Sequence, residues 1–342
     1  MSRHVSTDPD PDVESRTIAD EYRLFAERQA RGRSPRYETL SLGVAEDERL
    51  LALLRELPPI KRQPNLLLAA ARHLGAPVDS SDGFRAWVIA HWDRVSSLVL
   101  SRLTQTNESA RCATLLPLLA ALPQPLALIE VGASAGLCLH PDRYRYRYDE
   151  GEPFGPTDSP ITLPCRTTGP VPIPRRLPEV VRRAGVDLNP LDPSDPEDAG
   201  WLESLVWPEQ TERLERLRGA LEVARAEPAH LVRGDLNETV GRLVAQAPEG
   251  ATPVVFHSAV LAYLSPEARA RFTRTMRGLP CRWISNEAPD VLPAVRDLLP
   301  EPPPTGRTTF VLGLDERPVA FTGPHGEHLD WFAGARLPVP GE

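Results

Sequence analysis

The sequence is short of lysine, of clustered cysteine and of long apolar runs. Only one of its 39 basic residues is lysine, Lys61, which we interpret as a compositional bias rather than a sign of mechanism. No run approaches the roughly 18 consecutive apolar residues that a membrane span needs. The four cysteines lie far apart and form no Cys-x-x-Cys pair, which argues against a zinc site or a disulfide framework. We therefore predict no metal, no membrane partner and a reduced, cytoplasmic protein.

Charge and length narrow the class of protein further. The formal net charge is −8, without a clustered basic stripe, which argues against a nucleic-acid partner. The 342 residues predict about two domains of roughly 150 residues each. Residues 1–15 are polar, rich in Pro and Asp and without an apolar core, so we expect a disordered tail rather than a signal peptide.

Apolar residues recur at helical spacing between residues 16 and 125. Phe84, Val88 and Val95, for example, fall on one helical face. Turn signals separate such segments, and no stretch has a convincing strand pattern. We predict an all-α N-terminal domain of about five helices over residues 16–125.

From residue 126 the pattern changes to alternating strands and helices. Short apolar runs with strand character occur at 126–131, 181–188, 229–235, 252–260 and 281–287. Amphipathic segments between them have helical spacing, which predicts a parallel, doubly wound α/β sheet. Two last strand-like segments, 307–315 and 317–323, predict a closing antiparallel hairpin. The α/β domain then covers residues 126–332, followed by a tail at 333–342.

Residues 141–180 interrupt this alternation. Tyr144, Tyr146 and Tyr148 alternate with arginines at a period of two, and 161–165 is a second extended segment. We predict a β-hairpin insertion followed by a Pro-rich connection, placed to form part of a lid. The tyrosines are expected to cover the sheet edge; alternatively, Tyr144 lines a substrate pocket.

The most informative stretch is IEVGASAGLCL, at residues 129–139. It predicts a strand, a turn containing Gly132 and Gly136, and then a helix. Glycines let the backbone approach a ligand closely, and a new helix presents free N–H groups there. The spacing is GxxxG with Ser134 in the middle, which fits the GxGxxG dinucleotide pattern poorly. A turn that uses glycine only for packing is the alternative.

The same stretch resembles the first motif of class I S-adenosylmethionine-dependent methyltransferases, in which an acid precedes glycines at alternate positions. The resemblance extends in order over about 126–332 and implies a Rossmann-like methyltransferase fold with S-adenosylmethionine as cofactor. It places Asp187 on the ribose and Asp235 beside the adenine, with Asp149 as the alternative ribose acid. The cofactor-binding residues that it implies are Glu130, Gly132, Ala133, Ser134, Gly136, Asp187, Asp235 and Leu236.

Other segments are similar to an uncharacterised actinobacterial family, DUF2332. They are QTNESARC (105–112), EVGASAGL (130–137), DRYRYRY (142–148), GVDLNPLD (185–192) and WLESLVWPEQ (201–210). This resemblance covers nearly the whole chain and implies no established reaction.

Several polar residues are candidates for chemistry beside such a cofactor. His257 ends an apolar strand, where ligands bind in open α/β sheets, and is a candidate general base. Asn107 and Arg111 are candidates for binding substrate or the methionine carboxylate. Asn286 and Glu287 end the next strand, at the same edge of the sheet as His257, and are further candidates for binding substrate. Each has a structural alternative. Asn107 caps a helix, His257 is satisfied by local hydrogen bonds, and Asn286 and Glu287 begin a polar loop.

Together these observations predict an S-adenosylmethionine-binding enzyme that methylates a small molecule. The alternative is a methyltransferase-like binding or regulatory protein without turnover, and a nicotinamide-dependent oxidoreductase is disfavoured by the glycine spacing. The residues identify neither the substrate nor the oligomeric state.

Overall fold

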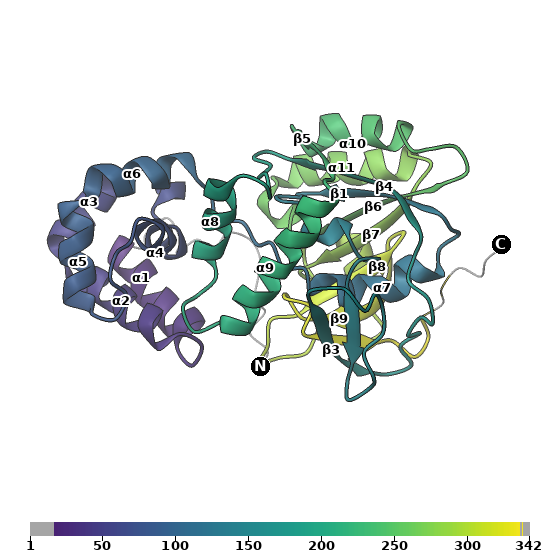
Figure 1. Cartoon of the computed structure of the whole chain (residues 1–342), viewed down its shortest axis with the longest axis horizontal. Helices are drawn as coiled ribbons and strands as arrows, with labels where there is room; N and C mark the ends of the chain where they lie inside the picture. Colours follow the sequence, from purple (N-terminus) through teal and green to yellow (C-terminus); the bar gives the residue numbers. More distant parts are fainter. Residues whose placement is uncertain (1–16, 336, 338–342) are drawn as a thin grey trace. The chain divides into compact units, whose positions relative to one another are not determined.

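The computed structural model describes residues 17–335 and 337 (Figure 1). The predicted tail at 1–15 and most of the predicted tail at 333–342 lie outside these residues. The chain divides into two compact units: residues 1–106 with 196–215, and residues 107–195 with 216–342. This division differs from the predicted boundary at residue 125.

The first unit is built from helices with polar caps and apolar inner faces. Thr17 and Asp20 form a capping box on the first helix, and Ser34 and Ser80 cap two others. Tyr22 and Leu54 are among its fully buried side chains. Its α-helices are α1 (Ile18–Phe25), α2 (Pro35–Glu46), α3 (Glu48–Arg55), α4 (Pro64–His73), α5 (Ser81–Ala90), α6 (Trp92–Ser101) and α8 (Pro196–Leu205), with shorter turns η1 (Ala26–Ala30) and η2 (Pro59–Lys61).

Helix α8 joins this unit although it follows the first sheet strands in the sequence. The indole N–H of Trp201 donates to the carbonyl of Leu103 at 3.2 Å, and Arg102 pairs with Asp198. Helix α7 (Arg111–Ala121), by contrast, belongs to the unit of the sheet and contacts its strands. A single boundary at residue 125 would place α7 in the first unit and α8 in the second, because it assigns each helix by sequence order alone.

The second unit contains one ten-stranded, mostly parallel sheet. The strand order is β2-β3-β10-β9-β8-β7-β6-β1-β4-β5. Its strands are β1 (Leu126–Val131), β2 (Arg145–Tyr148), β3 (Thr162–Thr168), β4 (Val180–Asp187), β5 (His230–Arg233), β6 (Thr252–Ser258), β7 (Arg282–Glu287), β8 (Phe310–Leu314), β9 (Arg317–Thr322) and β10 (His328–Trp331).

Five adjacent parallel strands, β5-β4-β1-β6-β7, confirm the predicted doubly wound sheet. Taken in chain order, they run 3-2-1-4-5, the order of Rossmann-like sheets. Helices α10 (Leu236–Ala245) and α11 (Pro266–Gly278) pack side by side on one face, over a core that includes Ile129, Val255 and Trp283 (Figure 1). The strand order reverses between β1 and β6, which is where such sheets bind ligands.

Three further predictions meet different outcomes. Strands β8 and β9 form the predicted antiparallel hairpin, around a turn at Asp315 and Glu316. The predicted hairpin in the 141–180 insertion is wrong, because β2 and β3 pair in parallel and β3 continues into the sheet beside β10. The predicted helix after Gly136 is only the three-residue turn η3 (Leu137–Leu139).

Candidate functional site

The candidate site lies at the carboxyl ends of β1, β4 and β6, at the switch point of the sheet. Two loops meet there: residues 132–136 after β1 and residues 259–263 after β6. Val260 touches Gly132 directly, because a Cβ built on Gly132 would lie 2.4 Å from a Val260 methyl carbon. The two loops therefore pack against each other without a gap at this point.

Gly132 has a structural reason to be glycine. Its φ of 71° lies in the left-handed region, and Val260 fills the space that a side chain would need. Gly136 has a similar φ of 70° and faces Leu231 and Leu139. The structure thus places these glycines at packing positions, and the space beside Gly132 belongs to the protein rather than to a ligand.

Asp187 and Asn107 hold the loop after β1 in place. The Ser134 amide donates to one Asp187 carboxylate oxygen at 2.8 Å, and the Asn189 amide donates to the other at 2.7 Å. The Asn107 amide group donates to the Ser134 hydroxyl at 2.5 Å and accepts from the Ala135 amide at 3.0 Å. Asn107 therefore positions the loop, whereas each Asp187 oxygen keeps a free lone pair for a further donor.

Acidic side chains end three adjacent strands. Glu130 lies one residue before the end of β1, Asp187 ends β4, and Asp235 follows β5. The Gly234 amide donates to the Asp187 carbonyl at 3.0 Å, which fixes the ends of β4 and β5 beside each other. Asp235 is exposed and caps α10 through the amide of Asn237. Asp149, by contrast, follows β2 at the far edge of the sheet and binds the Thr167 amide.

Glu130 carries a buried carboxylate oxygen with no hydrogen-bond partner among the described residues. Burial raises the pKa of this carboxyl well above its ordinary value, and the Cys138 thiol and Asp187 raise it further. Arg111 opposes this rise in the Glu130 pKa. An unsatisfied buried acid of this kind gains from a donor or a positive charge brought by a ligand.

Arg111 is buried at the start of α7. Its guanidinium donates to the carbonyl of Pro324 at 2.8 Å and to that of Ser258 at 3.0 Å. The second bond places it at the end of β6, next to the residue that follows His257. It ties α7 to this edge, and its positive charge lowers the pKa of Glu130.

The geometry around His257 does not support its predicted role as a general base. The imidazole is fully buried, and its Nδ1 lies 2.7 Å from a Glu287 oxygen. The Trp283 indole N–H donates to its Nε2 at 2.9 Å. An indole can only donate, so Nε2 is unprotonated and the Nδ1 proton points to Glu287. Neither nitrogen is left to take a proton from a substrate.

The remaining predicted residues are packed into the protein. Tyr144 is fully buried, and its hydroxyl donates to the Leu137 carbonyl at 2.7 Å. Asn286 is fully buried between the hydroxyls of Ser258 and Thr322. Ala133 is buried against Gly185. Leu236 packs against the core over the sheet.

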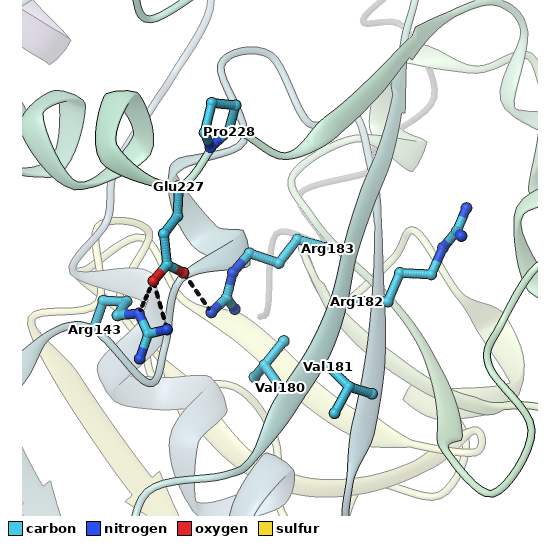
Figure 2. Close-up of a pocket in the computed structure, with 7 residues that line it drawn as sticks. All are labelled: Arg143, Val180, Val181, Arg182, Arg183, Glu227 and Pro228. Atoms are coloured by element: carbon cyan, nitrogen blue, oxygen red, sulfur yellow. Dashed lines mark hydrogen bonds and ion pairs between the residues drawn. The ribbon is translucent and has the colours of Figure 1, made fainter.

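A hollow of about 270 Å³ lies at the start of β4 (Figure 2). Its Glu227 carboxylate binds Arg143 at 2.8 Å and Arg183 at 3.1 Å, while Arg182 points away from this cluster. Strand β5 pairs with β4 only from Ala184 onward, so the first half of β4 has an open edge here. Charged side chains commonly protect such edges.

Metal and membrane features are also absent from the part of the chain that the structure describes. Within residues 17–335, no group of three or more His, Cys, Asp or Glu side chains is placed to hold a metal ion. None of the described helices is long and apolar enough to cross a membrane.

Replacing Gly132 by alanine is expected to lower the free energy of unfolding by about 2–3 kcal/mol, because the new methyl group overlaps Val260 and the φ is strained. Chemical denaturation of Gly132→Ala, Val260→Ala and the double variant checks this. The double variant should be more stable than the sum of the single losses predicts. Strict additivity would show that Val260 is not what restricts Gly132.

Comparison with known proteins gives a family for the chain. A family profile described as "Uncharacterized protein conserved in bacteria (DUF2332)" matches residues 19–331. No curated protein and no solved structure matches the chain. The function therefore has to be argued from the site.

Proposed function

The chain belongs to the DUF2332 family, and we propose that it binds S-adenosylmethionine at the carboxyl ends of β1, β4 and β5, beside the switch point, and methylates a small molecule. The observation that carries the proposal is the row of acids at the ends of β1, β4 and β5. Glu130, Asp187 and Asp235 line one side of the edge where doubly wound sheets bind their ligands.

The charge of this row favours a cationic ligand. Three carboxyl groups lie on neighbouring strands, and one oxygen of Glu130 is buried without a partner. S-adenosylmethionine carries a sulfonium, an ammonium and a carboxylate group, so its net charge is positive, and it has no phosphate. A positively charged ligand lowers the electrostatic free energy of placing these carboxyl groups close together, whereas a phosphate-bearing ligand would raise it.

The backbone after β1 also argues against a dinucleotide. Nicotinamide and flavin dinucleotides place their pyrophosphate at the N-terminus of a helix that follows the glycine turn. Here the turn leads into the three-residue η3, which offers no such helix end. A nucleoside without phosphates does not need one.

The residues at the edge have distinct roles in this proposal. Asp187 has lone pairs left for the two ribose hydroxyls, and Asp235 is exposed beside it for the adenine. Glu130 faces the positive charge of the cofactor. Asn107 fixes the loop that carries Ser134, so its effect on binding is indirect.

When bound, S-adenosylmethionine supplies a methyl group on a positively charged sulfur. The protein's contribution is then to align the acceptor and exclude water, which by itself can supply most of the rate enhancement. With both nitrogens of His257 occupied, we assign no protein base, so the acceptor is one whose nucleophile needs none. The same occupied histidine favours the second candidate, a binding protein without turnover.

Calorimetric titration with S-adenosylmethionine, NAD and AMP tests the proposal. We expect binding of the first and weaker or no binding of the other two, because of the acids and the missing helix end. Mass spectrometric detection of S-adenosylhomocysteine with candidate acceptors then separates the two candidates: product indicates transfer, and binding without product indicates the silent protein. Preferential binding of NAD would overturn the proposal.

Cofactor binding should release a proton from Glu130. Its pKa is raised in the free protein, and a cation beside it lowers that pKa. Between the two pKa values the affinity therefore rises with pH, by up to tenfold per pH unit. Titrations in two buffers of different ionisation enthalpy measure the proton, and Glu130→Gln should abolish it. Equal proton release by Glu130→Gln would place the titrating group elsewhere.

A further inference from the structure

We infer that Tyr263 is the surface on which a planar aromatic ring of the methyl acceptor stacks, positioned there by the buried Glu287, His257 and Trp283. This inference rests on the proposed function and names its substrate class. Its observations come from the loop after β6, which the cofactor roles above leave unused.

Tyr263 has the most exposed large hydrophobic side chain among the described residues. It is the last residue of η4 (Leu261–Tyr263), and 88% of it is accessible. The next most exposed is Leu188, at 68%, directly after Asp187. One follows β6 and the other follows β4, so they flank the end of β1 from its two sides. Large apolar groups exposed beside a ligand-binding edge are candidates for contact with the ligand.

A buried carboxylate fixes the loop that carries Tyr263. One Glu287 oxygen accepts from the Val260 amide at 2.9 Å, the Leu261 amide at 3.1 Å and the His257 imidazole. Glu287 and Trp283 are buried, and Trp283 in turn holds His257. The turn that ends in Tyr263 is thus anchored at its first residues by groups that do not reach solvent.

Holding this loop has a cost in conformational energy. Ala259 adopts a φ of 57°, a left-handed value that costs a non-glycine residue free energy. The Ala259 amide donates to the Asn286 carbonyl at 3.0 Å, and Val260 is pressed onto Gly132. Strained residues that persist in a rigid frame cluster at ligand sites, and a backbone that is already fixed loses less entropy when a ligand binds. The frame therefore preorganises the backbone that carries Tyr263.

The side chains exposed on the two sides of the switch point indicate which ligand Tyr263 contacts. The acids that favour the cationic cofactor end β1, β4 and β5, on one side of the switch point. On the other side, Glu287 is buried, and Tyr263 is the large apolar side chain that reaches solvent, followed by the exposed Glu267. The exposed ring of Tyr263 therefore suits stacking by a flat aromatic ring. Stacking on one tyrosine favours a ring over a saturated analogue by about 3- to 10-fold.

Matched probes test the inference. In the presence of S-adenosylmethionine, ligand-detected NMR compares benzoate with cyclohexanecarboxylate, and phenol with cyclohexanol, on the full chain. Each pair has the same charge and similar size but differs in planarity. We expect the aromatic member to bind about 3- to 10-fold more tightly, Tyr263→Ala to remove this preference, and Tyr263→Phe to retain it. Glu287→Gln should reduce the preference and speed amide exchange at Val260 and Leu261.

The failure of the inference differs from failure of the proposed function. The affinity for S-adenosylmethionine, measured on the same variants by calorimetry, tests the proposed function alone. If that cofactor binds but the wild type shows no aromatic preference, or Tyr263→Ala keeps the full preference, the inference is wrong. If the preference depends on Tyr263 but the cofactor does not bind, the proposed function is wrong and the aromatic site stands.

Discussion

Replacing Asp187 by alanine is expected to weaken the binding of S-adenosylmethionine at least about 100-fold. Two hydrogen bonds from ribose hydroxyls to a carboxylate contribute about 1.5–3 kcal/mol each, and about 2.7 kcal/mol corresponds to 100-fold. The loss has a second source, because Asp187 also holds the Ser134 amide and so the loop after β1. Calorimetric titration of the folded variant measures the effect.

Asp149→Ala is the matched control for this prediction. Asp149 is also an acid after a strand, but it lies at the far edge of the sheet and binds the Thr167 amide. Its removal should leave the cofactor affinity within about twofold, since it makes no contact at the switch point. If Asp149→Ala weakens binding more than Asp187→Ala does, the ribose lies beside β2 and the site is misplaced.

The second large effect concerns stability. Glu287→Ala is expected to reduce the free energy of unfolding by about 3–5 kcal/mol, because two buried donors and one partly buried donor lose their shared acceptor. These donors are the His257 imidazole and the amides of Val260 and Leu261. Guanidinium denaturation followed by circular dichroism measures the loss.

An exposed ion pair in the same unit provides the comparison. Arg277 pairs with Glu316 at 2.7 Å, but more than half of the arginine side chain is exposed. Arg277→Ala should therefore change the free energy of unfolding by no more than about 1 kcal/mol. A Glu287→Ala protein as stable as the Arg277→Ala protein would mean that the loop after β6 is not anchored by this carboxylate.

The doubly wound part of the sheet was predictable from the sequence because its signals are local. Each parallel strand is a short apolar run between helical segments, and the final hairpin has two strand patterns around a tight turn. The insertion was harder. The alternation in Tyr144–Tyr148 indicates a strand but does not say which neighbour it pairs with, and β3 joins β10 over 160 residues away in the sequence.

The roles of the site residues depend on partners distant in the sequence. A histidine at a strand end has the same local pattern whether it is free or enclosed. His257 is enclosed by Trp283 and Glu287, which lie on the next strand, and no local pattern announces that pairing. Gly132 is similar: its spacing indicates a close approach, but only the fold shows that Val260 makes it.

The roles of Val260 and Tyr263 also depend on contacts with residues that are distant in the sequence. Val260 belongs to the predicted strand 252–260, but the strand stops at Ser258 and the chain turns at Ala259, so that Tyr263 lies in a short helical turn after it. The acids Glu130, Asp187 and Asp235 were found because an acid at the end of an apolar strand is visible locally. Sequence patterns thus located the edge of the sheet, while its internal contacts needed the structure.

A crystal structure of the protein with S-adenosylhomocysteine tests the central claim most directly. The account predicts the ribose hydroxyls within hydrogen-bond distance of Asp187, the adenine beside Asp235 and the amino-acid end toward Glu130, at the carboxyl ends of β1 and β4. Density for the ligand in the arginine-lined hollow at the start of β4, or elsewhere away from the switch point, would contradict it.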